Sequence, residues 1–380
     1  TSYASFDPLP PRATKLGAVP TIAGKLTGGK AAFAYIIPWD RHEAVKMVWS
    51  LLEEGYKLSY ASRTFQTVGR SFGPGTVIAF VSANKDSIHE AIPRLCKGYG
   101  LDVYSTNSGL TDKGINLGSN YVRPFKKPEI GILSDAPVSP NDYGELWYLF
   151  DQDYSIPFTA LRSRDLAAAP LSRYDVLILP DGDFRAALDS TRIVRLKRWI
   201  EEGGILIGIE GGARFMTKNR SGLTPALLET DKKEEEKTKE ERDLEKEKKE
   251  IAKHQSLFEK EESDRLQRIP GTIFRALIDT THPIGYGYAR ESYVFKGDAP
   301  AIQLSEAAHT VVRFSPDTAS ASGYVTRDRA RKIADSGYLL DFRIGRGRAV
   351  LFAENVTFRM FWVGHQKLLL NAILFLPQPQ

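Results

Sequence analysis

The chain has 380 residues, of which 42% are hydrophobic and 26% charged, a composition that fits a soluble globular protein large enough for two domains. No apolar run approaches the roughly 18 residues that cross a bilayer, so no membrane span is expected. The chain carries a net charge of +5, but its basic residues are scattered along the sequence and do not alternate with aromatic residues. Nucleic acid is therefore not an expected partner. Cys96 is the only cysteine, which excludes an intrachain disulfide, and its apolar neighbours predict a buried thiol.

Residues 1–30 predict an extended tail, because proline and glycine interrupt every periodic pattern there. A small α/β domain is expected over residues 31–127. Its helices are predicted from apolar residues at helical spacing, and its strands from short β-prone runs between glycine turns. The expected elements are strands at 31–37, 57–61, 65–71, 75–81 and 101–104, and helices at 43–54 and 86–99.

A second α/β domain, built on a parallel sheet, is expected over residues 128–380. Strands and helices alternate in its first part, and the run 174–180 is continuously apolar, which is typical of a strand buried on both faces of a parallel sheet. The chain then returns to mixed strands before a strongly apolar closing helix. The expected strands are 129–134, 158–161, 174–180, 204–209, 272–278, 310–314, 338–344 and 348–354, and the expected helices are 143–151, 191–202 and 361–375.

A charged segment at residues 229–268 interrupts this second domain with 15 acidic and 12 basic side chains. Charges of both signs at three- and four-residue spacing predict a projecting helical insertion, with a disordered tether or a partner-binding helix as alternatives. Leu244, Ile251 and Phe258 keep a seven-residue spacing, but three positions are too few to indicate a coiled coil.

The most informative stretch joins the apolar strand 204–209 to Glu210-Gly211-Gly212. A strand that ends in a glycine turn and leads into a helix presents one residue at the carboxyl edge of a doubly wound sheet. This turn resembles that of class I glutamine amidotransferases, in which the presented residue is the nucleophilic cysteine. Glu210 stands at that position here, so the resemblance implies the architecture of an active site without its reactive atom.

Other catalytic and metal-binding patterns are missing from the sequence. The six histidines occur in none of the H-x-x-E, H-x-x-x-H or H-E-x-x-H frames that pre-arrange zinc ligands, and no metal or other cofactor is predicted. No G-x-S-x-G motif occurs, and the strand 348–354 runs on without a histidine until His365. No catalytic residue is therefore assigned, and the non-catalytic interpretation of this chain is favoured.

Polar residues gather at the expected carboxyl ends of the strands, where ligands bind in open parallel sheets. Three interpretations stay open. The first is a ligand pocket in which Glu210 accepts hydrogen bonds or pairs with Arg214, and the second is that the acids cap helix N-termini. The third is a hydrolase or amidotransferase-like activity that uses Glu210 with Asp181 or Arg214. A peptide, a sugar or another small molecule is the expected ligand of such a pocket. The candidate ligand-binding residues are Asp135, Asp181, Asp183, Glu210, Arg214, Glu354 and Asn355.

Segments spread over residues 31–376 resemble the C-terminal part of large bacterial zinc carboxypeptidases of the carboxypeptidase A-like family. In these proteins a flavodoxin-like domain, similar to class I glutamine amidotransferases, follows the peptidase. The resemblance implies a non-catalytic region that positions substrate or partner or has a structural role, an upstream peptidase domain as partner, and a periplasmic or secreted location. None of the family's zinc-binding motifs has a counterpart here, so no catalytic residue is carried over. The matching segments are 65–76, 102–118, 171–182, 208–215, 269–274, 345–359 and 368–375.

Overall fold

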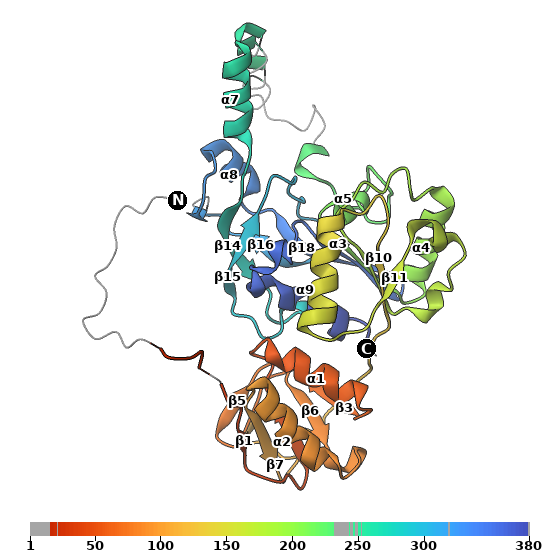
Figure 1. The fold of residues 1–380 in the computed structure, drawn as a ribbon, viewed down its shortest axis with the longest axis vertical. Helices are drawn as coiled ribbons and strands as arrows, with labels where there is room; N and C mark the ends of the chain where they lie inside the picture. Colours follow the sequence, from red (N-terminus) through yellow and green to blue (C-terminus); the bar gives the residue numbers. More distant parts are fainter. Residues whose placement is uncertain are drawn as a thin grey trace, which may run out of the picture.

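The computed structural model of the chain describes residues 16–20, 22–231, 253–317 and 320–378, together with 243, 246, 247, 250 and 251. A smaller α/β unit, coloured red to orange in Figure 1, packs against one end of a larger α/β unit. Helix α7 projects from the opposite end of the larger unit (Figure 1). The α/β class expected from the sequence is confirmed.

The smaller unit is built on a six-stranded sheet of order β1-β7-β2-β6-β3-β9. Its four central strands alternate in direction, and the helices follow β2 and β6 in the chain, which gives two split β-α-β units of the ferredoxin-like kind. A separate small sheet has the order β5-β4-β8. The elements are β1 Leu26–Thr27, β2 Ala34–Ile37, α1 Glu43–Glu53, β3 Leu58–Ala61, β4 Phe65–Thr67, β5 Arg70–Phe72, β6 Val77–Phe80, α2 Ile88–Tyr99, β7 Val103–Thr106, β8 Lys113–Gly114 and β9 Val122–Phe125.

The smaller unit differs in detail from the sequence-based expectation. Strands β8 and β9 are not among the expected strands. The run 65–71, predicted as one strand, is the hairpin β4–β5, because Val68 and Gly69 both have positive φ (47° and 73°) and form a two-residue turn. A β-branched residue is rare in that conformation, so the sequence carries no clear signal for the turn. Residues 26–27, within the segment expected to be a tail, pair in parallel with β7.

The larger unit contains a ten-stranded sheet with a parallel and an antiparallel half. The parallel half has the order β11-β10-β12-β13-β19, which is the flavodoxin-like order 2-1-3-4-5. The antiparallel strands β18, β16, β14 and β15 extend the sheet beyond β19, and β17 pairs with β14. The strands are β10 Ile130–Leu133, β11 Thr159–Leu161, β12 Val176–Leu179, β13 Ile205–Ile209, β14 Thr272–Ile278, β15 Glu291–Lys296, β16 Ala308–Phe314, β17 Ser320–Ser322, β18 Gly337–Ile344 and β19 Gly347–Phe352.

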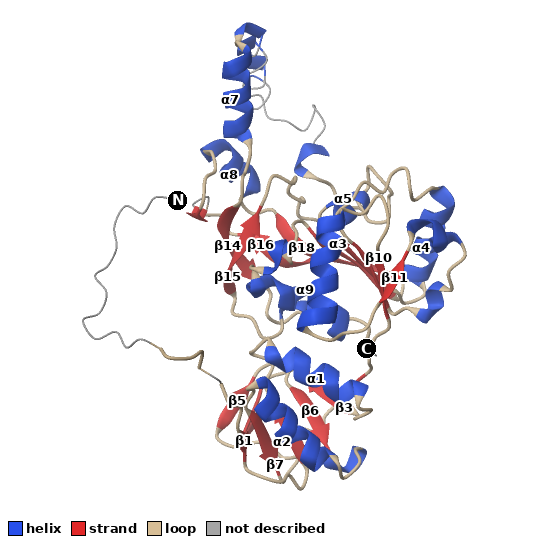
Figure 2. Cartoon of the chain, in the orientation of Figure 1, coloured by secondary structure: helices blue, strands red, loops and turns tan. Residues whose placement is uncertain are grey.

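Helices cover both faces of the parallel half (Figure 2). Along β12 the side chains alternate between two cores: Val176 and Ile178 pack with α3 and α9, whereas Leu177 and Leu179 pack with α4 and α5. This burial on two faces explains why the strand is apolar at every position. The helices are α3 Pro140–Trp147, α4 Ser190–Glu201, α5 Gly211–Phe215, α7 Leu257–Gln267, α8 Arg327–Ile333 and α9 Val363–Phe375. In the described part of the chain, no helix has the length and apolarity needed to cross a membrane.

The two units meet where Trp39, just after β2, packs on α9. The Trp39 indole nitrogen donates to Asn371 Oδ1 (2.8 Å), and Asn371 Nδ2 donates to backbone oxygens of the larger unit. Lys367 Nζ donates to the Trp39 carbonyl and lies 5.4 Å from the centre of its ring. Burial of this ammonium lowers the pKa of Lys367 to about 8. A Cβ at Gly287 would lie 1.9 Å from the Trp39 oxygen, so the close approach of the units requires glycine there.

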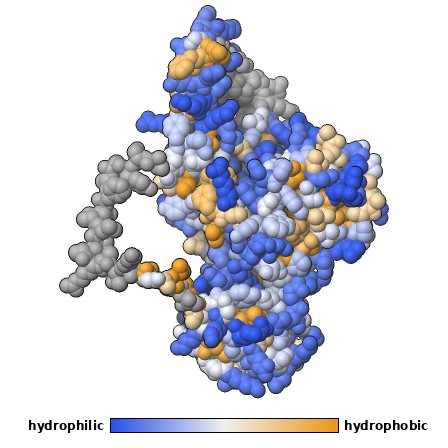
Figure 3. All heavy atoms as spheres, in the orientation of Figure 1, coloured by the Kyte–Doolittle hydropathy of each residue, from blue (hydrophilic) through white to orange (hydrophobic). Residues whose placement is uncertain are grey.

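Helix α7 lies within the charged segment predicted to form a helical insertion. Its N-terminus carries a capping box, in which Ser256 Oγ accepts from the Glu259 backbone nitrogen and Glu259 Oε2 accepts from Ser256 N (2.8 Å). Ile251 and Phe258 are 52% and 73% exposed, and Leu244 lies outside the described residues, so the seven-residue spacing is not tested. Figure 3 shows hydrophobic side chains on this projection within a largely hydrophilic surface.

Replacing Ser256 with alanine is expected to weaken the first turn of α7 by about 1 kcal/mol, because the cap oxygen is lost. The effect stays local, since α7 is largely exposed, so the measurement is hydrogen exchange of the α7 amides. Ser263→Ala, in the middle of the same helix, is the matched control and should leave protection almost unchanged. Equal protection in the parent and Ser256→Ala would contradict the capping role.

Candidate ligand site at the carboxyl edge of the larger sheet

Glu210 occupies a sharp corner between β13 and α5. Its backbone has φ 50° and ψ −105°, a conformation that a non-glycine residue rarely adopts. Two hydrogen bonds hold the corner: Glu210 N donates to Phe352 O (2.9 Å), and Arg214 N donates to Glu210 O (2.8 Å). The strand-to-helix corner predicted from the sequence is therefore present, and it presents a carboxyl group.

The two glycines after Glu210 are required by the packing of α5 on the end of β12. A Cβ at Gly212 would lie 2.1 Å from the Leu179 carbonyl oxygen, and one at Gly211 would lie 2.4 Å from Asp181 Oδ1. Both distances are far below van der Waals contact, and the Leu179 oxygen is backbone that cannot easily move. The corner therefore requires glycine at both positions after Glu210.

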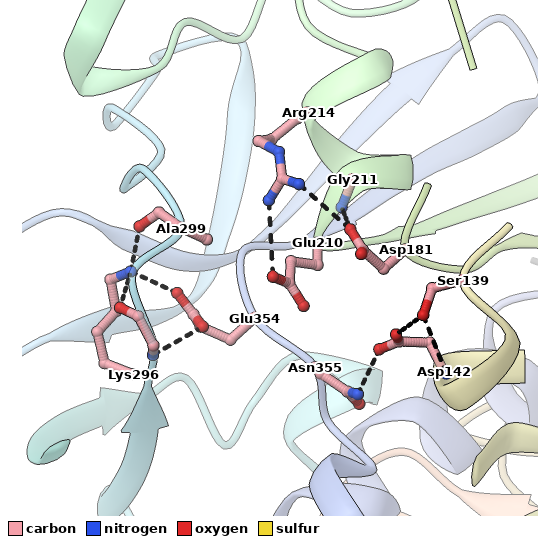
Figure 4. A network of polar contacts seen from close by, with 11 residues as sticks. Ser139, Asp142, Asp181, Glu210, Gly211, Arg214, Lys296, Ala299, Glu354 and Asn355 are labelled. Carbon is pink, nitrogen blue, oxygen red and sulfur yellow. Dashed lines mark hydrogen bonds and ion pairs between the residues drawn. The ribbon is translucent and has the colours of Figure 1, made fainter. Parts of the chain in front are cut away.

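Asp181, at the end of β12, connects the corner to Arg214 (Figure 4). Its Oδ1 accepts from the Gly211 backbone nitrogen (2.7 Å) and from Arg214 Nη2 (3.2 Å). Arg214 Nη1 lies 3.8 Å from Glu210 Oε1. In enzymes with such a corner, the N–H of the residue after the nucleophile stabilises the oxyanion. Here that N–H belongs to Gly211 and already donates to the Asp181 carboxylate.

The environment of Glu210 favours its protonated form. Burial raises the pKa of Glu210 to about 8, the carboxylates of Asp181 and Glu354 contribute in the same direction, and Arg214 opposes them. At neutral pH the side chain is therefore mostly neutral and can donate a hydrogen bond as well as accept one. The site combines a neutral acid, a carboxylate and a guanidinium group within a few ångströms.

Glu354, after β19, is engaged in a buried ion pair with Lys296 at the end of β15 (Figure 4). The Glu354 and Lys296 residues are only 2% and 1% exposed. Gly297 N also donates to Glu354 Oε2 (2.9 Å), and Lys296 Nζ donates to the carbonyls of Gly297 and Ala299. Glu354 therefore fastens the end of β19 to that of β15. Lys296 is not among the predicted residues, because β15 itself is not predicted.

Asn355 joins the end of β19 to helix α3. Its Nδ2 donates to Asp142 Oδ1 (2.6 Å) and to Glu145 Oε2 (2.7 Å). Burial raises the pKa values of Asp142 and Glu145. Neither acid is among the predicted site residues. The signal available for Asp142 is the helix start at Ser139, whose side chain caps α3 by accepting from the Asp142 nitrogen.

Asp135 and Asp183 lie outside this network. Asp135 Oδ1 accepts from the backbone and side chain of Ser163 (2.7 and 3.1 Å), which fixes the loop after β11. Asp183 is largely exposed and forms an ion pair with Arg185 (2.6 Å). Of the seven predicted residues, the structure thus brings Glu210, Asp181 and Arg214 together. Glu354 lies close enough to raise the pKa of Glu210. Asn355 instead forms hydrogen bonds with side chains of α3.

A crevice of about 460 Å³ opens beside Arg214. It lies at the carboxyl ends of β10, β12 and β13, and so includes the switch point between β10 and β12 where ligands bind in doubly wound sheets. Its volume falls within the range of about 300–1,000 Å³ typical of ligand pockets. It is lined by Pro137, Ser139, Asp181, Gly182, Asp183, Phe184, Arg185, Gly211, Arg214, Phe215 and Arg220.

No cysteine or histidine is among the residues that line this crevice. Cys96 is buried in α2, as predicted, and burial raises its pKa. His365 is buried beside Tyr338, and burial lowers the pKa of His365 to about 4. His282 Nε2 lies 3.0 Å from Asp341 Oδ2. Across residues 16–20, 22–231, 253–317 and 320–378 and the few described between them, no three His, Cys, Asp or Glu side chains are placed to hold a metal ion.

Comparison with known proteins finds likenesses only among solved structures. No family model and no curated protein matches the chain. A protein described as ThuA-like from Bacteroides uniformis is 11% identical, with a TM-score of 0.39, over 67% of this chain and 93% of that one. A second ThuA-like protein, from Parabacteroides merdae, is 10% identical, with a TM-score of 0.40, over 65% and 89%. A cytoplasmic protein of Salmonella typhimurium is 13% identical, with a TM-score of 0.37, over 65% and 97%. At these values the likenesses assign neither a family nor a function.

Proposed function

We propose that the crevice beside Arg214 binds a short peptide or another small polar ligand, and that this chain does not catalyse acyl transfer. The observation that carries the proposal is the bond from Gly211 N to Asp181 Oδ1 (2.7 Å), which fills the position of an oxyanion donor with a carboxylate. Glutamate is also a poor acyl-transfer nucleophile. The charged groups that act on Glu210 most strongly are Asp181, Glu354, Arg214 and Asp142, none of which is the imidazole base of a triad.

Two further features support binding at this crevice. Glu210 does not line the crevice but directly precedes its lining residue Gly211, and its strained backbone, which costs about 1–3 kcal/mol, is of a kind that clusters at functional sites. The crevice also offers donors from Arg214, Arg185 and Arg220 beside acceptors from Asp181 and Asp183. Groups of both charges suit a ligand such as a short peptide, which carries an ammonium group, a carboxylate and amides.

Thermal unfolding with a panel of di- and tripeptides tests the proposal. A compound that binds the native state raises the unfolding midpoint by mass action. We expect at least one peptide to raise the midpoint of the parent, and this increase to be lost in Arg214→Ala. Arg198→Ala is the matched control, because Arg198 forms an exposed ion pair with Glu202 on α4. Each variant is compared with its own ligand-free midpoint, and an increase that persists in Arg214→Ala would contradict the proposal.

A second candidate function follows from the protonation state of Glu210. A carboxyl group with a pKa of about 8 suits general acid–base catalysis at neutral pH, so a hydrolase or amidotransferase-like enzyme that uses Glu210 with Asp181 or Arg214 is the alternative. A substrate screen with Glu210→Gln decides between the two. Any hydrolysis that Glu210→Gln retains in full would remove this alternative, whereas a loss of about 100-fold or more would favour it over pure binding.

We further propose that the larger unit is a class I glutamine amidotransferase-like domain without its nucleophile, in the C-terminal region of an exported zinc carboxypeptidase-like protein. The 2-1-3-4-5 strand order, the corner at Glu210 and the resemblance of segments such as 171–182 and 345–359 support this. Its partner would be a peptidase domain that precedes residue 1. The reading frame upstream tests the proposal: an H-x-x-E peptidase behind an export signal is expected, and an unrelated upstream domain would overturn it.

A further inference from the structure

A second pocket lies in the seam between the two units and has a volume of about 300 Å³. The smaller unit contributes the loop after β2 and the β4–β5 hairpin, including Asp40 and Arg70. The larger unit contributes the segments around Thr281 and Tyr288. Pockets between domains are a common location of ligand sites, and this volume lies at the lower end of their usual range. A ligand here would touch both units.

The charged groups of this pocket neutralise one another. Arg70 Nη2 donates to Asp40 Oδ2 (2.6 Å), while Nη1 donates to the Tyr104 hydroxyl (2.6 Å). The guanidinium carbon also lies 5.0 Å from the centre of the Tyr104 ring, which helps to fix its position. The Asp40 side chain is 55% exposed, so its carboxylate can still accept from a ligand. Asp40 would repel a negatively charged ligand, and Arg70 would repel a positively charged one.

The rest of the lining offers hydroxyl groups and aromatic rings. Thr64, Ser71, Thr280 and Thr281 line the pocket with hydroxyl-bearing side chains. The hydroxyls of Thr76 and Tyr288 donate to the Gly73 and Gly364 carbonyls (2.7 and 2.6 Å). The Thr281 hydroxyl donates to Asp279 Oδ1 (2.6 Å), which leaves its oxygen lone pairs directed elsewhere and able to accept. Trp39, Phe72 and Tyr288 supply rings. Such a lining matches a neutral molecule that carries several hydroxyls, each of which donates and accepts, on an apolar carbon frame.

We propose that the seam pocket binds a neutral sugar of monosaccharide size, held by Asp40 and Arg70 of the smaller unit and by Thr281 of the larger one. The ligand bridges the two units, so its binding stabilises their docked arrangement. The proposal does not depend on the function of the crevice beside Arg214, which lies at the carboxyl edge of the parallel strands and shares none of these residues.

The experiment is a titration of the whole chain with glucose, galactose, mannose and N-acetylglucosamine, followed by calorimetry and by thermal unfolding. At least one sugar should bind the parent. Asp40→Asn and Thr281→Val should each weaken that binding about tenfold or more, because the first replaces a charged acceptor of the smaller unit with a neutral amide and the second removes a hydroxyl of the larger unit. Asp86→Asn, which changes an exposed carboxylate of the same unit, is the matched control and should bind like the parent. Arg214→Ala should also retain sugar binding.

Three outcomes would overturn the proposal. The first is that none of the four sugars binds the parent. The second is that sugar binding is unchanged in both Asp40→Asn and Thr281→Val. The third is that the response disappears in Arg214→Ala but persists in Asp40→Asn, which would place the sugar in the other crevice. Circular dichroism of each variant confirms that the fold is retained before binding is compared.

Discussion

Replacing Lys296 with methionine is expected to lower the free energy of unfolding by about 3–5 kcal/mol. The substitution removes the cation and leaves the carboxylate of Glu354 buried with the Gly297 N–H as its remaining partner. Burying an unpaired charge is costly, because the interior cannot replace the solvation that water provides. Chemical denaturation of the parent and the variant measures the difference.

Two controls separate this charge effect from a simple change in packing. The double variant Lys296→Met/Glu354→Leu removes both charges and should recover most of the lost stability, because a hydrophobic pair can replace a buried ion pair at little cost. Lys126→Met breaks an exposed pair with Asp175 and should cost less than about 1 kcal/mol. If Lys296→Met were no less stable than Lys126→Met, the buried pair would not have the structural role assigned to it.

The stability advantage of Glu210→Gln over the parent is expected to grow as the pH rises from about 5 to 9. The folded-state pKa of Glu210 is about 8, against 4.5 for an ordinary glutamate, so the folded state binds more protons between these values. The stability of the parent therefore falls as the pH rises through this window, by a total on the order of 4 kcal/mol at its upper end. Glutamine cannot ionise and does not suffer this loss.

Denaturation midpoints of both proteins at several pH values measure this difference. Near pH 5 the protonated glutamate and the glutamine are both neutral, so the two proteins should have similar stability. Glu202→Gln, at the residue that follows α4, is the matched control, because the Glu202 side chain is 58% exposed and forms a surface ion pair with Arg198. A constant difference between parent and Glu210→Gln from pH 5 to 9 would show that the carboxyl group is not perturbed.

The parallel half of the larger sheet could be predicted from the local pattern of apolar residues in the sequence. The runs at β12 and β13 are apolar at every position because helices cover both sheet faces, and the corner at Glu210 is visible in its glycines. Strand β15 and helix α8 are not predicted, since the apolar residues of β15 are partly exposed and α8 has only two apolar residues, Ala330 and Ile333. Lys296 is missed together with β15, and its partner Glu354 lies 58 residues further along the chain. Such a pairing depends on tertiary structure and leaves no local signal.

The contact between Trp39 and Asn371 spans 332 positions of the chain, so the order of synthesis constrains assembly. The smaller unit can fold early, since its own sheet and helices are complete by residue 125. Its docking surface is α9, which comprises residues 363–375 and is translated long after that unit. A nascent chain that stops before α9 would therefore carry a folded first unit without its anchor, and the exposed apolar face around Trp39 would be open to chaperones. Joining the two units is thus a late event that must wait for translation of α9.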